Sequence, residues 1–116
     1  MFKLEESMEE KLKKYKEILN LQNWDIQVIE EDSLETEGMS KILFNDYKAI
    51  IKIKRELSDV EKDKTLIHEL LHLIHRDELD LISDNLRDEA IASMYERFHE
   101  RSIEQMAKII YKLCNS

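Results

Sequence analysis

The sequence predicts an α+β fold with the element order α-β-β-β-α-α, in one domain that spans residues 1–116. Two patterns support this prediction. Apolar residues recur at helical spacing near both ends of the chain and around residue 67, whereas they alternate with polar residues between residues 24 and 55. A chain of 116 residues with no proline and one glycine is also long enough for one hydrophobic core and too short for two ordinary domains.

A helix and three strands are expected in the first half of the chain. Residues 7–10 match a capping box, and apolar residues at helical spacing continue to about Asn20. Alternating apolar residues then predict three strands, at residues 24–30, 39–45 and 47–55. We expect a small antiparallel sheet, with a turn at Asn45 and Asp46 and the last one or two strands near an edge. The single glycine, Gly38, marks the most favourable position for a tight turn.

Two further helices are expected to complete the fold. Residues 58–61 form a second capping box, so a helix should begin there and carry apolar side chains toward the core: Val60, Ile67, Leu70, Leu71 and Ile74. We expect a connection at residues 77–84. From about Asn85 a long helical pattern runs nearly to the C-terminus, through Leu86, Ala90, Met94, Phe98, Ile103, Met106, Ala107, Ile110 and Leu113.

Composition and charge disfavour several classes of protein. The formal charge of −8, from 18 basic and 26 acidic side chains, disfavours nucleic-acid binding through phosphate neutralisation. No apolar run approaches the length of a membrane span, and the N-terminus lacks a secretory signal pattern. The lone Cys114 excludes an internal disulfide framework and is interpreted as a reduced thiol. We therefore expect a cytoplasmic protein that binds neither nucleic acid nor membrane.

The stretch HELLH at residues 68–72 carries the most specific chemical signal. On a helix, His68 and His72 lie one turn apart on the same face and can bind one Zn²⁺. Glu69 is offset by about 100°, where its carboxylate can act as general base without binding the metal. A shuffled chain of this composition would show the pattern in roughly 2% of cases, and its position inside a capped helix after three strands makes accident less plausible still.

The third metal ligand is expected from the long C-terminal helix. His75 lies seven residues after His68, about 10.5 Å along one helix, which is too far for both to share an ion with His72. If the two helices are antiparallel about residues 80–81, the metal level near residue 70 is mirrored near residue 91. This favours Glu89 from a stripe of glutamates at 89, 96 and 100, and a pivot shifted by three residues would favour Glu96 instead.

Three other polar side chains are weaker candidates. His75 could contact the metal ligands without binding the metal itself, or it could face the substrate; otherwise it is a partly buried packing residue. Tyr95 and His99 could polarise a substrate carbonyl, although both residue types are common at the boundary of a core.

These motifs resemble the zincin metallopeptidases, and most closely the short gluzincin-like proteins of the ImmA/IrrE type found in phages and mobile elements. The resemblance rests on HELLH, the strand pattern before it and the later helix that carries glutamates, and it covers roughly residues 24–100. It implies a minimal zincin fold, a Glu third ligand and hydrolysis of peptide bonds, possibly in a phage or mobile-element regulator. Such proteins usually carry a glutamate-rich EAN-like stretch, where residues 87–91 here read RDEAI.

Two rival functions belong to different classes. In the first, the metal is a structural element of a regulatory or binding protein, which a closed fourth ligand would support. In the second, the acidic C-terminal helix binds a partner protein and HELLH is incidental. The leading prediction is a zinc metallopeptidase whose protein or peptide substrate aligns with an edge strand.

Overall fold

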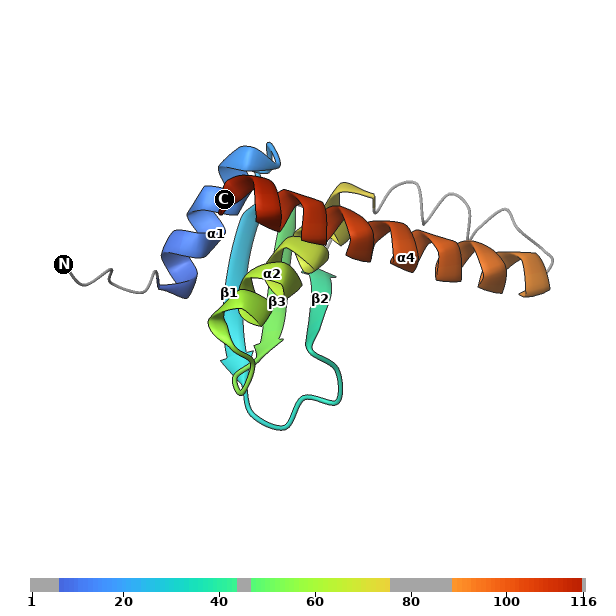
Figure 1. Cartoon of the computed structure of the whole chain (residues 1–116), viewed down its shortest axis with the longest axis horizontal. Coiled ribbons are helices and arrows are strands. Elements are labelled where there is room, and N and C mark those ends of the chain that lie inside the picture. The colour runs from blue at the N-terminus through green and yellow to red at the C-terminus, as the bar shows by residue number, and fades with distance from the viewer. Residues whose placement is uncertain (1–6, 44–46, 76–88, 116) are drawn as a thin grey trace.

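Within residues 7–43, 47–75 and 89–115, the computed structural model contains the elements α1 (Met8–Ile18), β1 (Asp25–Glu31), β2 (Gly38–Leu43), β3 (Lys48–Lys54), α2 (Asp59–Ile74) and α4 (Glu89–Cys114) (Figure 1). The predicted α+β class and the order α-β-β-β-α-α are confirmed. The expected turn at Asn45 and Asp46, the connection at residues 77–84 and the start of the last helix near Asn85 lie outside the described residues.

Serine caps begin the first two helices, as the two capping boxes predict. The Ser7 Oγ accepts a hydrogen bond of 3.1 Å from the backbone N–H of Glu10, and the Ser58 Oγ accepts one of 3.2 Å from that of Glu61. Each bond satisfies a backbone donor that has no partner within its own helix. The start of α2, and hence the position of HELLH within it, is therefore fixed by local sequence.

The sheet is mixed, with the strand order β1-β3-β2. β2 pairs with β3 in the antiparallel direction, but β1 pairs with β3 in the parallel direction, which corrects the expected antiparallel sheet. Alternation of apolar and polar residues reports which face of a strand is buried and says nothing about strand direction. In the order β1-β3-β2, β3 is the central strand and β2 is an edge strand.

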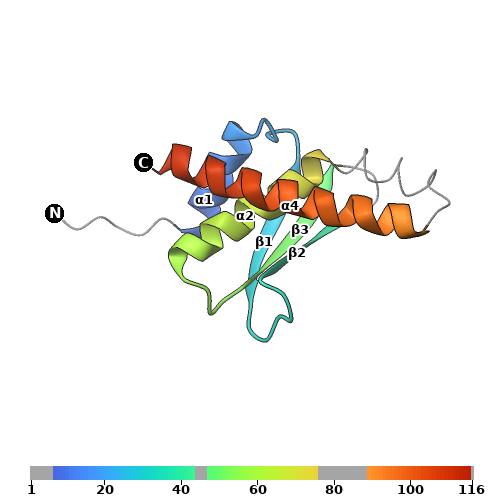
Figure 2. The ribbon, with the colours of Figure 1, turned by 45° about the vertical axis from the view of Figure 1, so that its right-hand side comes forward.

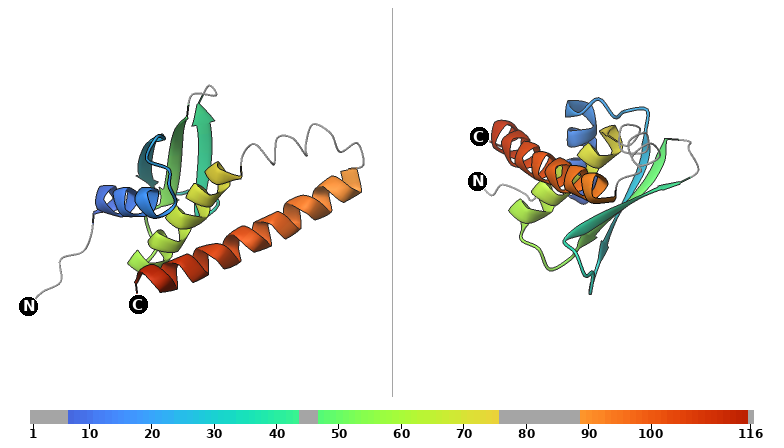
Figure 3. Two further views of the ribbon diagram at one scale, coloured as in Figure 1. Left: turned by 90° about the horizontal axis from the view of Figure 1, so that it is seen from above. Right: turned by 90° about the vertical axis from the view of Figure 1, so that its right-hand side faces the viewer.

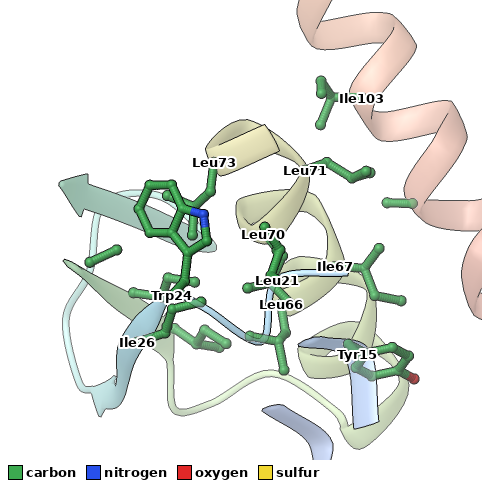
Figure 4. Close-up of a cluster of buried hydrophobic side chains, with 14 residues drawn as sticks. Tyr15, Leu21, Trp24, Ile26, Leu66, Ile67, Leu70, Leu71, Leu73 and Ile103 are labelled. Atoms are coloured by element: carbon green, nitrogen blue, oxygen red, sulfur yellow. The ribbon is translucent and has the colours of Figure 1, made fainter. Parts of the chain in front are cut away.

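The core lies between the inner face of the sheet and α2, with α1 and α4 closing its sides (Figures 2 and 4). Ile51 and Ile53 of β3 and Leu66, Ile67 and Leu70 of α2 are fully buried. Val60 and Ile74, which were expected to face the core, are 45% and 44% exposed. They lie in the first and last turns of α2, beyond the part of the helix that packs on the sheet.

Gly38 has a different role from the tight turn that the sequence suggested. It is the first residue of β2, and its φ is not positive. A Cβ at this position would lie 2.5 Å from the Thr65 Cγ2 of α2 and 3.3 Å from the backbone oxygen of Lys52. The absence of a side chain at Gly38 therefore lets α2 pack directly against the edge strand.

A buried polar network joins α1, α2 and the C-terminal end of α4, which lies beside α1 (Figure 1). The Tyr15 hydroxyl donates a hydrogen bond of 2.7 Å to one oxygen of Asp63, and the Lys11 ammonium lies 2.6 Å from the other. The side-chain amide of Asn115 donates to the Tyr15 hydroxyl at 3.1 Å. Burial, chiefly, raises the pKa of Tyr15 well above its usual range. The network fixes where α4 ends, and so helps to fix its register against α2.

Candidate metal centre

Two helices bring three possible metal ligands together. His68 and His72 lie on one face of α2, with their ring centroids 4.9 Å apart, and Glu100 faces them from α4. The Glu100 carboxylate lies 3.1 Å from the His68 Nε2 through one oxygen and 2.8 Å from the His72 Nε2 through the other. One potential ligand atom from each of these residues lies within 4.8 Å of the other two.

The chemistry and spacing of these donors fit a zinc ion. Two imidazole nitrogens and one carboxylate form a donor set that catalytic zinc sites use, with the fourth position left for water or substrate. Tetrahedral zinc with bonds of 2.0–2.2 Å holds its ligand atoms about 3.3–3.6 Å apart. The possible ligand atoms of the cluster all lie within 4.8 Å of one another, so small side-chain movements would bring them to these separations. The His68 and His72 side chains are 23% and 19% exposed, so the three-residue cluster opens to solvent on one side.

Glu69 lies beside this cluster but is oriented differently, because it follows His68 by one residue on the helix. It is only 6% exposed, and the Ser40 side chain of β2 forms a hydrogen bond with it. Burial raises the pKa of the Glu69 carboxyl, while the nearby His68 and the bond to Ser40 oppose the rise. A carboxylate with a raised pKa in a partly dry site is suited to accept a proton near neutral pH.

A cleft of about 900 Å³ runs between β2, α2 and α4 and contains the cluster. Gly38, Ser40 and Ile42 line it from the edge strand, and His68, Glu69 and His72 line it from α2. Glu100 closes the opposite wall. The possible ligands, the buried carboxylate and an edge strand therefore face one space large enough for an extended peptide segment.

Glu89 does not belong to this cluster, so the arrangement differs from the favoured prediction for the third ligand. Glu89 is the first residue of α4 and is exposed, about three turns from Glu100. The residue of α4 that faces the two histidines is Glu100, nine residues after the position near residue 91 that the antiparallel arrangement predicted. Glu96, the alternative, is also exposed and outside the cluster. Which glutamate would face the histidines depends on the register of α4, and helical spacing alone does not set it.

His75, Tyr95 and His99 form a second group next to His72, and they do not line the cleft. The His99 ring lies 5.3 Å from that of His75 and 6.0 Å from those of Tyr95 and His72. Burial lowers the pKa of His72, and the neighbouring His68 and His99 add to this effect, whereas Glu100 opposes it. Roles for His75, Tyr95 and His99 in binding or polarising a substrate remain predictions.

Ser40 is the site residue that the sequence reading missed. Gly38, Ser40 and Ile42 alternate on the inner face of β2, so Ser40 is a polar residue on a face that otherwise packs against α2. A hydroxyl at such a position needs a hydrogen-bond partner, and Glu69 provides it. That alternation was the only sequence signal that could have identified Ser40.

Comparison with known proteins identifies the family of this chain. Residues 21–108 match the family described as Peptidase_M78, the IrrE N-terminal-like domain, and this range contains β1 to β3, α2 and all three possible metal ligands. A search of curated proteins and a search of solved structures gave no match. Among the described residues, no helix is both long and apolar enough to cross a membrane. The chain belongs to the Peptidase_M78 family of IrrE N-terminal-like domains.

Proposed function

We propose that the protein is a zinc-dependent peptidase that hydrolyses a peptide bond in a protein substrate. The observation that carries this proposal is the common cleft, in which His68, His72 and Glu100 can hold a metal beside the buried carboxylate of Glu69. Membership of a peptidase family supports the same reaction class. A purely structural metal would not require a buried acid next to an open ligand cluster.

A zinc ion held by His68, His72 and Glu100 would supply Lewis acidity for the scissile carbonyl and for an attacking water near neutral pH. Glu69 accepts the proton from the attacking water and then passes it to the nitrogen of the leaving amine. Ser40 holds the Glu69 carboxylate in place through its hydrogen bond. His68, His72 and Glu100 would hold the ion, and Glu69 follows His68 directly on α2, so the carboxylate and the ligands belong to the same rigid pair of helices.

The edge strand β2 supports an extended protein segment as the substrate. Its inner-face residues line the cleft, and its outer edge carries no further strand among the described residues. A substrate strand could therefore pair with the backbone of β2 and cross the metal cluster. By its resemblance to phage-associated proteins, we expect a cytoplasmic regulator encoded near this protein to be such a substrate.

The test compares purified wild-type protein with Glu69→Gln and with the matched control Glu96→Gln, which removes an exposed carboxylate of α4 outside the cluster. Elemental analysis should find close to one zinc per chain in all three proteins. Incubation with neighbouring regulators should give fragments with the wild type and the control, while Glu69→Gln should be slower by about 10² to 10⁴. Wild-type protein without stoichiometric zinc would refute the proposal, and zinc-loaded wild type that cleaves none of these regulators would favour a structural metal.

A further inference from the structure

Helix α4 has a second apolar face besides the one that packs into the core. Ile103 and Ala107 are its buried residues, whereas five large apolar side chains are between 49% and 75% exposed: Ile91, Met94, Phe98, Ile109 and Leu113. At 3.6 residues per turn, these five fall in one sector of about 100° around the helix axis. We call this set the outer stripe, and it points away from the side that faces α2.

The charged residues of α4 are also sorted by side. All of its Lys and Arg side chains lie in a sector of about 60° that adjoins the outer stripe. We call them the basic row: Arg97, Arg101, Lys108 and Lys112. The glutamates of α4 occupy a sector of about 80° on the side of the metal cluster instead: Glu89, Glu96, Glu100 and Glu104. The helix thus presents an apolar band edged by positive charge on a protein whose formal charge is −8.

The outer stripe exposes a large apolar area. At about 200 Å² for a large apolar side chain, five side chains that are 49% to 75% exposed present roughly 500 Å², which is the size of the largest apolar patch on a typical monomer, and such patches are often functional. The stripe extends from Ile91 to Leu113, about 33 Å along the helix, with the polar residues Ser102 and Gln105 in its middle. Figure 3 shows that α4 continues well past the end of α2, so much of the stripe lies on a projecting helix.

The charge pattern selects the partner. If two copies of α4 paired in antiparallel fashion through the outer stripe, symmetry would place basic row against basic row, and the like charges would repel. Within the basic row, Arg101 lies over the Phe98 ring at 5.8 Å, and the Lys108 ammonium lies 3.8 Å from the Glu104 carboxylate, which is a long ion pair. An apolar face flanked by glutamate or aspartate would complement both the stripe and the row.

We propose that the outer stripe and the basic row form a docking surface for an acidic amphipathic helix of another protein. The apolar anchors would be Met94 and Phe98 in one half of α4 and Ile109 and Leu113 in the other. Docking there uses a different face of α4 from Glu100, so the inference does not depend on catalysis.

The experiment measures binding of designed, fluorescein-labelled helical peptides by anisotropy. One peptide has leucines at 3-4 spacing and glutamates along both flanks, and its partner peptide has lysines in place of the glutamates. We expect wild-type protein to bind the glutamate peptide at least about tenfold more tightly than the lysine peptide. Met94→Ser/Phe98→Ser should weaken binding of the glutamate peptide at least about tenfold. Arg97→Glu/Arg101→Glu should reverse the preference between the peptides.

Two controls keep these outcomes interpretable. Glu96→Gln, on another face of α4, should bind like the wild type, and circular dichroism should show that every variant keeps its helix content and unfolding midpoint. Failure of the glutamate peptide to bind, or equal binding of both peptides, would overturn the proposal. A stripe-dependent dimer in analytical ultracentrifugation would assign the surface to a second copy instead. Stripe-dependent binding to phosphatidylserine vesicles, without binding of the glutamate peptide, would assign it to a lipid surface.

Discussion

Replacing Gly38 with Ala should lower the free energy of unfolding by about 1–3 kcal/mol, the usual cost of overpacking a tight contact. The added Cβ would lie 2.5 Å from the Thr65 Cγ2, where carbon atoms in contact are normally about 3.5–4.0 Å apart. Thr65 is 7% exposed and is β-branched, so its methyl group has little freedom to move away. The backbone itself does not oppose alanine, because φ at Gly38 is not positive.

The same substitution also affects the unfolded chain, and this effect on the free energy of unfolding has the opposite sign. Alanine restricts the unfolded chain more than glycine does, which by itself would stabilise the protein by about 0.4–1 kcal/mol. The steric overlap should exceed this gain, because α2 packs on both β2 and β3 and cannot shift away from the edge strand alone. Lys41→Ala, an exposed change on the same strand, should alter stability by no more than about 0.5 kcal/mol and serves as the control.

Urea unfolding followed by circular dichroism provides the measurement, at one fixed zinc concentration for all variants. Thr65→Ser removes the clashing methyl group and keeps the hydroxyl, and alone it should cost about 0.5–1.5 kcal/mol. In the double variant, the combined loss should be at least about 1 kcal/mol smaller than the sum of the two single losses. If Gly38→Ala is as stable as the wild type, or if Thr65→Ser does not reduce the stability loss caused by Gly38→Ala, the proposed close packing of α2 on β2 is incorrect.

Three further predictions concern the metal and the buried network. Glu100→Ala should weaken zinc affinity at least about 100-fold, while Glu89→Ala should leave it unchanged, as measured by competition with a chelating dye. Asp63→Ala should cost about 3–5 kcal/mol in chemical denaturation, because it leaves the Lys11 ammonium buried without its carboxylate. Because burial raises the folded-state pKa of Tyr15, the free energy of unfolding should fall as pH rises above the unfolded value of about 10, and this fall should be smaller in Tyr15→Phe.

Local sequence determined much of this fold, and each success has a local cause. The serines at 7 and 58 identify where α1 and α2 begin, since a cap needs only a side chain and the backbone three residues later. The alternation at Ala49, Ile51 and Ile53 correctly marked the buried face of β3. HELLH correctly predicted that the rings of His68 and His72 lie close together on α2, because a single helix fixes the relative positions of residues four apart.

The features that local sequence did not determine depend on contacts between distant segments. Parallel pairing of β1 with β3 depends on where β2 lies in the sheet, which no single strand encodes. Which glutamate faces the histidines depends on the register of α4 against α2, and that register is fixed by packing at Ile103 and Ala107 and by the Asn115 contact with Tyr15. Spacing within a stripe of several glutamates therefore could not predict that Glu100 lies beside His68 and His72.

Because Glu100 lies on a different helix from the two histidines, a metal ion bound by all three would also cross-link α2 and α4. His72 and Glu100 are 28 residues apart in the chain, since 100 minus 72 is 28, and an ion bound to both closes a loop of that length. By the chain-entropy relation used for disulfides, closing such a loop removes about 3–4 kcal/mol of freedom from the unfolded ensemble. Release of the ion would lower the barrier to detaching α4 from α2. Metal occupancy would then govern how long this protein resists digestion by other proteases, in addition to the proposed peptidase activity.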